Sequence, residues 1–286
     1  MRWNRNYVKE AAESGTVVPG FNVFGYEDAQ AVIRAAEKAG SPVILMINKG
    51  AREAMDIQSW ARLLISLGQR AEVPVGVHLD HCSDLNLIRQ AVENGFTSVM
   101  YDGSMLPFEE NWKITQKMAE YAHARGVFLE GELGRVPYSD LGQREIRYTS
   151  PKEAAGMFEK TDVDWLAVSV GNVHRLAEGT AAINFSVLEK IQKVCRLPLV
   201  IHGSSGISEK DAAKLKKEKI GKMNFGTILR KTFTDALRQE MKRYPEEFDR
   251  LKLFEYPVKR IEQEAYQIIS KLQKEEKDEN SAERAI

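Results

Sequence analysis

Short apolar runs alternate with longer segments in which apolar residues recur every three or four positions, and this alternation continues through most of the chain. Because side chains on one face of a helix recur about every 3.6 residues, the longer segments are expected to be amphipathic helices. The clearest are Glu27–Lys38, Leu85–Asn94, Glu109–Ala124, Pro151–Lys160 and Phe185–Val194. The short runs are eight expected strands: Val18–Val23, Pro42–Ile47, Val73–Leu79, Ser98–Tyr101, Val127–Leu133, Trp165–Val170, Pro198–His202 and Lys222–Phe225. Strands and helices that alternate in this way predict a parallel sheet.

Eight strand–helix units favour an α/β fold of the closed (β/α)8 TIM-barrel type over an open doubly wound sheet, and no G-x-G-x-x-G follows the first strand. Gly40, Gly95 and Gly126 follow expected helices, where a left-handed residue commonly ends the helix. Ser150 before Pro151 is typical of a helix start. We expect one domain over 1–286, with the barrel at about 15–243 and a C-terminal helical extension with a charged tail at about 244–286. The extension includes a helix over about Leu251–Leu272 and the tract Lys274–Arg284.

Composition narrows the class of protein. The chain has 286 residues, of which 43% are apolar and 29% charged, a balance typical of a soluble globular protein. The 41 basic and 41 acidic residues cancel, so no overall field favours nucleic acid or an anionic membrane. No run approaches the roughly 20 apolar residues of a membrane span, and Met1–Glu10 does not resemble a signal peptide. Together with only two cysteines, these features lead us to expect a cytoplasmic enzyme with reduced thiols.

Histidines give the first indication of chemistry. Of five, His123 lies in an expected helix, whereas His78, His81, His174 and His202 lie at or just beyond strand ends. In this fold those positions open onto the face where active sites are built. A single histidine there is more often a hydrogen-bonded polar residue than a ligand. Three or four converging from separate strands can bind Zn²⁺ and leave a position open for substrate, so we expect one divalent metal.

Acidic side chains gather at the same strand ends: Asp80, Asp102, Glu130 and Glu132. A period of two puts Glu130 and Glu132 on one face of their strand, as it does His78 and Asp80. If those faces point inward, acids lie beside the metal, where one can transfer a proton. The alternative for each acid is an ion pair with a neighbouring lysine or arginine.

Glycine-containing turns follow the last three strands: Gly171-Asn172, Gly203-Ser204-Ser205-Gly206 and Asn224-Phe225-Gly226-Thr227. In barrels the loops after strands seven and eight commonly bind phosphate through backbone N–H groups, which small residues leave accessible. Asn224 and Thr227 can add side-chain donors. These turns therefore predict a binding site for a phosphorylated substrate.

In combination these motifs resemble the class II, metal-dependent ketose-bisphosphate aldolases, which include fructose- and tagatose-bisphosphate aldolases. The resemblance covers about four-fifths of the chain, in order. It rests on Pro19-Gly20-Phe21-Asn22, Ser41-Pro42-Val43-Ile44, His78-Leu79-Asp80-His81, Tyr101-Asp102-Gly103-Ser104, Glu130-Gly131-Glu132-Leu133-Gly134, Gly171-Asn172-Val173-His174, His202-Gly203-Ser204-Ser205 and Asn224-Phe225-Gly226-Thr227.

The resemblance implies that His81, His174 and His202 bind one catalytic Zn²⁺ and that Asp80 is the proton-transferring acid/base. Glu132 and Asp102 would lie around the metal or be alternative ligands. Substrate and its phosphate would contact Asn22, Gly171, Arg175, Gly203, Ser204, Ser205, Asn224 and Thr227. The implied reaction is reversible aldol cleavage of a phosphorylated ketose to dihydroxyacetone phosphate, or a close analogue, and an aldehyde. Metal chemistry of this kind needs no lysine Schiff base. The implied assembly is a homodimer or homotetramer.

The chain departs from the family pattern at three places. Arg175 and Glu178 occupy positions where the family usually has a glycine and a lysine, and a guanidinium there suits phosphate, sulfonate or carboxylate. The loop 135–142 replaces a glycine-rich segment with a mobile acid; Asp140 or Tyr138 could serve instead, and Glu145 is a poorer candidate. The usual C-terminal arginine for a distal phosphate is missing, with Arg250 as a possible substitute.

Two alternatives follow from these departures. One keeps the aldol chemistry on an acid-bearing or modified sugar, whether sulfonated, carboxylated or lacking a second phosphate. The other is a metal-binding barrel that is not an aldolase, such as a regulatory subunit. Asp80 argues against the second alternative, because a protein that only binds its ligand needs no acid beside the metal.

Overall fold

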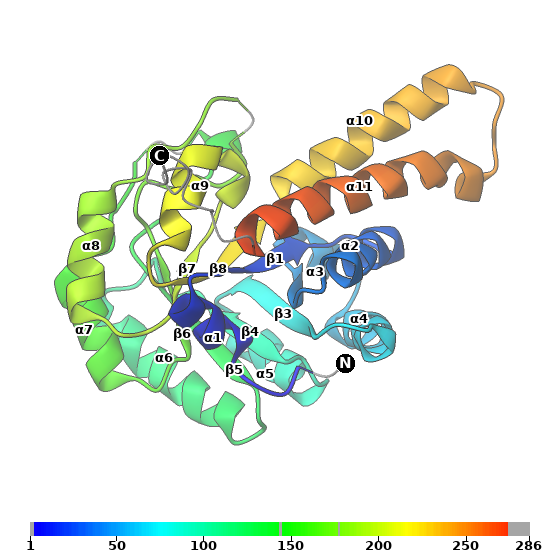
Figure 1. Cartoon of the computed structure of the whole chain (residues 1–286). Coiled ribbons are helices and arrows are strands. Elements are labelled where there is room, and N and C mark those ends of the chain that lie inside the picture. Colours follow the sequence, from blue (N-terminus) through cyan, green and yellow to red (C-terminus); the bar gives the residue numbers. More distant parts are fainter. Residues whose placement is uncertain (1–2, 143–144, 177, 274–286) are drawn as a thin grey trace, which may run out of the picture.

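A computed structural model describes residues 3–142, 145–176 and 178–273. Its parallel strands form a closed barrel in which each strand pairs with the next and the last pairs with the first. The strands are β1 (Val18–Asn22), β2 (Val43–Ile47), β3 (Val75–Cys82), β4 (Ser98–Tyr101), β5 (Phe128–Leu133), β6 (Trp165–Val168), β7 (Leu199–Ile201) and β8 (Ile220–Phe225). The expected TIM barrel is confirmed, as Figure 1 shows.

Helices cover the outside of the barrel. They are α2 (Tyr26–Ala39), α3 (Lys49–Ala54), α4 (Ile57–Arg70), α5 (Leu85–Glu93), α6 (Phe108–His123), α7 (Pro151–Lys160), α8 (Phe185–Val194) and α9 (Glu209–Lys216). Their apolar faces pack against the outward-facing strand residues in one large core. The glycines expected beyond the helices are left-handed, with φ of 63° at Gly40, 88° at Gly95 and 71° at Gly126.

The amino-terminal end of the barrel is closed by α1 (Tyr7–Ser14). Tyr7 and Val8 pack in a second core with inward-facing Met46 and Trp165, and the Trp165 indole N–H donates to Asn6 Oδ1 at 2.8 Å. The carboxyl ends of the strands are therefore the open end, which is where barrel enzymes carry their sites.

After β8 the chain forms a helical hairpin that projects from the barrel in Figure 1. It consists of α10 (Thr227–Arg243) and α11 (Arg250–Gln273), and α11 returns along α10 and α2. The expected C-terminal helix is confirmed, while the charged tract Lys274–Arg284 lies outside the described residues. None of the helices in the described ranges is long and apolar enough to cross a membrane.

Strand β3 ends at Cys82 and not at the expected Leu79. Between these two residues its register with β4 shifts. Within this irregularity His81 has a left-handed φ of 46°, which is uncommon for a residue with a side chain. In a regular strand Asp80 and His81 would point to opposite faces. The irregularity instead lets both side chains line the same cavity at the barrel mouth.

Strand β5 shows how alternation builds the barrel interior. Leu129 and Leu133 belong to the outer core, whereas Glu130 and Glu132 point inward and are almost completely buried. The period-two interpretation of these two acids is thus confirmed, and Glu130 lies deeper in the barrel than Glu132 because it precedes it along the strand.

Candidate active site

Three of the five histidines converge at the barrel mouth. His81 at the end of β3, His174 in the loop after β6 and His202 directly after β7 offer nitrogen atoms that all lie within 4.8 Å of one another. The ring centroids of His81 lie 4.4 Å from His202 and 4.8 Å from His174. His78 is not part of this group, because it is buried deeper in the barrel, where its Nδ1 contacts Ser98 Oγ at 2.9 Å.

The second ring nitrogen of His81 and one ring nitrogen of His174 are available to bind a ligand. His81 Nδ1 lies 3.0 Å from Asp102 Oδ2 and 3.4 Å from Glu132 Oε2. Among the described residues, the buried Nε2 atoms of His81 and His174 have no hydrogen-bond partner. Because a buried nitrogen without a partner is costly, these two atoms indicate a missing ligand such as a cation.

His202 is held differently. Its Nε2 contacts Glu130 Oε1 at 2.7 Å, so its remaining nitrogen is Nδ1, which contacts the Asn224 amide at 3.2 Å. Burial lowers the pKa of His174 and of His202 well below the usual value, and the nearby charge of His81 adds to this effect. Both rings are therefore neutral imidazoles, the form that binds metal ions.

The third histidine has the opposite shift. Burial acts to lower the pKa of His81, but its interactions with Tyr138 and Asp80 outweigh burial. Interactions with Glu132 and Asp102 act in the same direction, so the pKa of His81 is well above its usual value. A cation near this ring would have to displace a proton from it.

Asp80 faces the histidines from β3. Its Oδ2 accepts a hydrogen bond from Asn22 Nδ2 at 2.9 Å, its Oδ1 accepts one from Asn224 Nδ2 at 3.3 Å, and His202 Nδ1 lies 3.9 Å away. Burial acts to raise the pKa of Asp80, but the charge of His81 and other nearby interactions, including the hydrogen bond from Asn22, outweigh it, so the pKa is lowered. The carboxylate is ionised and oriented by two amides, as a general base requires.

A charged layer lies directly below the histidines. Lys222 on β8 is fully buried, and its Nζ lies 2.6 Å from Glu130 Oε2 and 3.4 Å from His78 Nε2. Glu130 therefore bridges Lys222 and His202. The ion-pair alternative for strand-end acids holds for Glu130, which contacts a lysine from a strand on the other side of the barrel.

Glu132 has a different environment. It is buried and has no lysine or arginine partner among the described residues; burial first, and then the neighbouring charge of Asp102, raise the pKa of Glu132 to about 8, against the opposing effect of His81. Glu132, His81 and Asp102 form a second group whose ligand atoms could hold a cation. The structure thus places both Glu132 and Asp102 beside His81.

The glycine turns line the same cavity. Gly203, Ser205, Asn224 and Thr227 all border it, and the Ile228 N–H donates to Ser205 Oγ at 3.3 Å, which joins two of the turns. Other candidates from the sequence lie elsewhere.

Ser204 and Gly171 are among those that do not line the cavity. Ser204 Oγ donates to the Ile201 carbonyl at 3.0 Å. Gly171 has a φ of 106°, and a Cβ there would collide with the Ala182 carbonyl. The Gly171 backbone therefore requires glycine for its fold, and its expected substrate contact stays a prediction.

Arg175 lies at the rim beside His174. Its φ is 52°, and its guanidinium donates to Asp140 Oδ2 at 2.7 Å. The Tyr138 ring stacks on the His174 ring, with ring centroids 4.5 Å apart, and the Arg175 guanidinium lies over the Tyr138 ring. Arg175 and Tyr138 line the cavity, whereas Asp140, Glu145 and Glu178 are exposed and do not. Arg250 lies on α11, paired with Glu27 at 2.7 Å.

Several residues of the site were not expected from the sequence. Lys222 and Asn48 looked like ordinary residues of a strand and a turn, yet Lys222 supports Glu130 and Asn48 Nδ2 donates to Asn22 Oδ1 at 3.3 Å. Arg52 donates to the His81 carbonyl and to Cys82 Sγ, both at 3.1 Å. The sequence held one signal for Lys222. It lies two residues before Asn224 on the same strand, and a period of two places both side chains inside the barrel.

Comparisons with known proteins agree with this geometry. The family model described as "Fructose-bisphosphate aldolase class-II" matches residues 4–277. The fructose-bisphosphate aldolase of Geobacillus stearothermophilus is 36% identical over 254 residues, covering 87% of this chain and 88% of that protein. The sulfofructosephosphate aldolase of Alkalicoccus urumqiensis is 32% identical over 248 residues, covering 85% and 86%. The crystal structure of the YdjI aldolase of Escherichia coli K12 superimposes with a TM-score of 0.83 at 31% identity, covering 96% and 97%.

Proposed function

Because the chain belongs to the class II fructose-bisphosphate aldolase family, we propose that it reversibly cleaves a phosphorylated ketose to dihydroxyacetone phosphate and an aldehyde. The observation that carries the proposal is the position of Asp80, an ionised carboxylate facing three histidines, two of which have buried Nε2 atoms without a hydrogen-bond partner among the described residues. Such a combination supplies a base beside a cation site, which is what cleavage of a carbon–carbon bond next to a carbonyl requires.

His81 and His174 through Nε2, and His202 through Nδ1, would hold the cation, and three imidazoles with an open position suit Zn²⁺. Bound there, Zn²⁺ would supply Lewis-acid polarisation of the ketose carbonyl. Glu130 and Asp102 orient two of the rings by accepting their other N–H groups.

In the cleavage direction Asp80 accepts the proton of the C4 hydroxyl while the C3–C4 bond breaks. Asn22 and Asn224 hold the carboxylate in position for this transfer through their amide hydrogen bonds. The fragment that keeps the carbonyl must then receive a proton at its former C3. Asp140 is our candidate for this second transfer: its carboxylate pairs with Arg175 at 2.7 Å and does not line the cavity, so it would have to leave Arg175 and take up a proton before donating it.

The phosphate of the dihydroxyacetone half would bind between the turns after β7 and β8. Gly203 and Ser205 from one turn, and Thr227 from the other, border the cavity, and the hydrogen bond from the Ile228 N–H to Ser205 Oγ joins the two turns. Gly203 has a φ of 66°, and a Cβ there would collide with the Val173 carbonyl, so the turn requires glycine to pack against the loop after β6.

The decisive experiment measures retro-aldol cleavage of the zinc-loaded protein over a panel of ketose mono- and bisphosphates, with a coupled assay for dihydroxyacetone phosphate. Cleavage of at least one phosphorylated ketose is expected. Activity confined to unphosphorylated sugars would contradict the proposal. A sulfonated ketose phosphate belongs in the panel, because one relative is named a sulfofructosephosphate aldolase and Arg175 suits a sulfonate.

We also propose that the chain, as one domain, forms homodimers or homotetramers in the cytoplasm. The support for assembly is a set of apolar side chains near the far end of the α10–α11 hairpin, with exposed fractions of 54% at Met241, 46% at Tyr244, 94% at Phe248 and 76% at Leu251. Apolar side chains gathered in this way mark interaction sites. Sedimentation of the wild type and of Phe248→Ser/Leu251→Ser would test this, with a monomeric wild type as the contrary result.

A further inference from the structure

His81 interrupts strand β3 at the point where the strand reaches the barrel mouth. Its φ of 46° is left-handed, and the register between β3 and β4 shifts across it. The pairing resumes at Cys82, which lies opposite Tyr101 and whose carbonyl accepts from the Asp102 N–H at 2.9 Å. Because the left-handed region is unfavourable for a residue with a side chain, other contacts have to stabilise the backbone of His81.

Side chains supply the hydrogen bonds of the His81 backbone. The His81 N–H donates to the Met100 sulfur at 3.3 Å, and a thioether sulfur is a weak acceptor. The His81 carbonyl accepts from Arg52 Nη2 at 3.1 Å, and such a bond from a charged donor is stronger than one between neutral groups. Arg52 thus provides the charged hydrogen bond that holds the irregular end of β3.

Arg52 is itself held in place on α3. Asn48 caps this short helix by accepting from the Ala51 N–H at 3.3 Å, and the buried Trp60 indole donates to the Ala51 carbonyl at 2.9 Å. Arg52 Nη1 donates to Cys82 Sγ at 3.1 Å, beside the carbonyl that accepts from Nη2. A planar guanidinium that binds two neighbouring acceptors fixes both of them. Helix α3 therefore anchors the end of β3 through Arg52.

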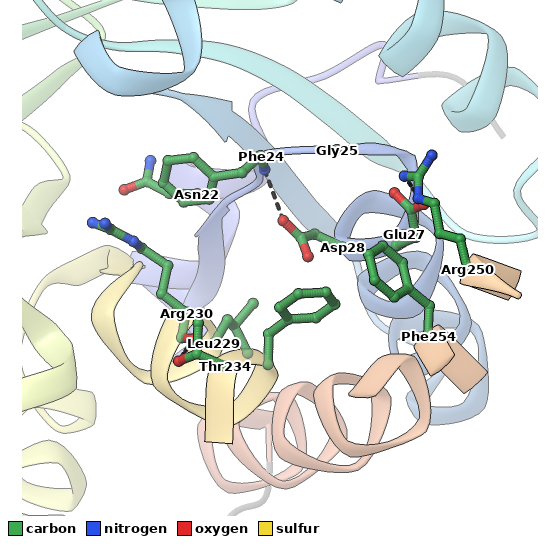
Figure 2. A pocket seen from close by; sticks show the side chains of 11 residues that line it. Asn22, Phe24, Gly25, Glu27, Asp28, Leu229, Arg230, Thr234, Arg250 and Phe254 are labelled. Carbon is green, nitrogen blue, oxygen red and sulfur yellow. Dashed lines mark hydrogen bonds and ion pairs between the residues drawn. The ribbon is translucent and has the colours of Figure 1, made fainter. Parts of the chain in front are cut away.

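The same helix reaches Asp80 by a second route. Asn48 Nδ2 donates to Asn22 Oδ1 at 3.3 Å, and Asn22 Nδ2 donates to Asp80 Oδ2 at 2.9 Å. Figure 2 shows Asn22 at one edge of a neighbouring pocket of about 440 Å³, on the opposite side of that pocket from Glu27. Helix α3 thus supports the proposed base and, one residue further along β3, the proposed metal ligand His81.

We propose that Arg52 is a positioning residue, whose bond to the His81 carbonyl keeps the His81 side chain in the barrel mouth, where it binds the metal ion. This inference rests on the metal site of the proposed function. Arg52 does not line the cavity at the histidines, so it acts through His81 and not on the substrate. In a regular strand the side chain of His81 would lie on the face opposite to Asp80. Without Arg52 the end of β3 can relax towards that geometry, and the metal loses one of its three proposed ligands.

The zinc affinity of Arg52→Met tests the proposal, because methionine keeps an apolar stem and removes both hydrogen bonds. We expect the affinity to fall about 10- to 100-fold, the usual effect of losing a residue that orients a metal ligand. Arg52→Lys keeps one charged donor and should lose less than Arg52→Met. Arg70→Met is the matched control, because Arg70 also donates to a backbone carbonyl, that of Ser66 at 3.3 Å, but at the exposed end of α4.

Cobalt(II) in place of zinc gives a readout that a loss of stability alone leaves unchanged, because its visible absorption depends on the number and geometry of its ligands. We expect the cobalt spectrum of Arg52→Met to differ from that of the wild type. Cys82→Ala should keep the wild-type spectrum, because it removes only the thiol contact and leaves the bond from Arg52 to the His81 carbonyl. Denaturant unfolding of the metal-free proteins measures stability separately.

The possible failures can be told apart. A wild type that binds no zinc would contradict the metal site and the role of Arg52 together, whereas one that binds zinc but cleaves no phosphorylated ketose would contradict the proposed reaction alone. With zinc bound to the wild type, an unchanged affinity and cobalt spectrum in Arg52→Met would overturn the role of Arg52. Equal losses in Arg52→Met and Arg70→Met, or an altered spectrum in Cys82→Ala, would do the same.

If Arg52→Met does not fold, Arg52→Gln takes its place, because its shorter neutral side chain also removes the charged donor. The expected losses are the same. Failure of both variants to fold would make Arg52 a residue on which the whole barrel depends, and this result would overturn its assignment as a positioning residue for His81.

Discussion

Glu130 and Lys222 form a fully buried ion pair directly beneath His202, with Oε2 and Nζ 2.6 Å apart. The pair joins β5 to β8 across the barrel interior, and the second oxygen of Glu130 accepts the His202 Nε2–H at 2.7 Å. A buried pair of this kind adds little net stability, but it fixes the orientation of whatever it touches. The ring of His202 is held by a charge pair that takes no direct part in the reaction.

Removing one member of this pair should affect both stability and metal binding. Lys222→Met leaves Glu130 buried without its partner, so we expect a loss of roughly 3–5 kcal/mol in the free energy of unfolding. We also expect zinc affinity to fall about 10- to 100-fold. Adding Glu130→Gln should recover part of the stability, because the unpaired charge is gone. Denaturant unfolding and competitive zinc titration measure the two effects, and equal stability of single and double variants would contradict the prediction.

Replacing His174 or His202 with alanine should abolish stoichiometric zinc binding, since each removes one of three proposed ligands. His123→Ala is the matched control, because His123 lies on α6 outside the barrel and contacts Asp164 at 2.8 Å. Metal analysis of the purified proteins after dialysis decides the matter. One zinc per chain retained in either His174→Ala or His202→Ala would refute the assignment of these histidines as ligands.

Asp80→Ala should keep the metal and lose about 10²- to 10⁴-fold in kcat, the usual contribution of a positioned acid or base. The metal content should survive because Asp80 contacts His202 only at 3.9 Å and binds chiefly to two amides. Steady-state kinetics together with zinc analysis give both quantities. Near-normal turnover would move the proton-transfer role to another residue.

The left-handed backbone at Arg175 should be measurable as strain. A side chain at φ 52° costs about 1–2 kcal/mol, whereas glycine adopts this conformation freely. Arg175→Gly and Arg175→Ala both lose the exposed ion pair with Asp140, which is worth at most about 1 kcal/mol. The glycine variant should therefore be more stable than the alanine variant by about 1 kcal/mol in denaturant unfolding. Equal stability would show that the backbone relaxes.

Asp28 should make the protein less stable as the pH rises. Burial raises the pKa of Asp28 to about 6, against the lowering effect of the Phe24 N–H bond. The folded chain then holds this proton more tightly than the unfolded chain, so stability falls between about pH 4 and pH 6 and stays lower above. Two pKa units correspond to roughly 3 kcal/mol as an upper limit.

Asp28→Asn keeps the acceptor oxygen and removes the titration. Unfolding free energies of wild type and variant should agree near pH 4, and the variant should be more stable at pH 7. Parallel curves for the two proteins between these pH values would contradict the raised pKa.

The barrel could be predicted because its signals are local and repeated. Alternation in β5 places Leu129 and Leu133 outward, and the glycines after α2 and α5 mark helix ends, so element order followed from the sequence. The end of β3 did not, because its irregularity at His81 depends on how β3 pairs with β4. A period-two pattern predicts only a regular strand, so it could not predict the irregular backbone at His81.

Within the site, strand ends identified the three histidines and Asp80 because parallel strands bring their carboxyl ends together. Lys222 was missed for a different reason. It has its role through a partner distant in sequence, Glu130, and such a pairing appears only after the barrel closes. The same holds for the pairing of Arg175 with Asp140.

Helix α1 gives the barrel only one entrance. With Tyr7 and Val8 packed against the interior from the amino-terminal side, nothing that enters at the histidines can leave through the opposite end. Both cleavage products must therefore depart through the same opening. Product release and substrate entry thus share the opening at the carboxyl ends of the strands, and product-inhibition patterns would record this sharing.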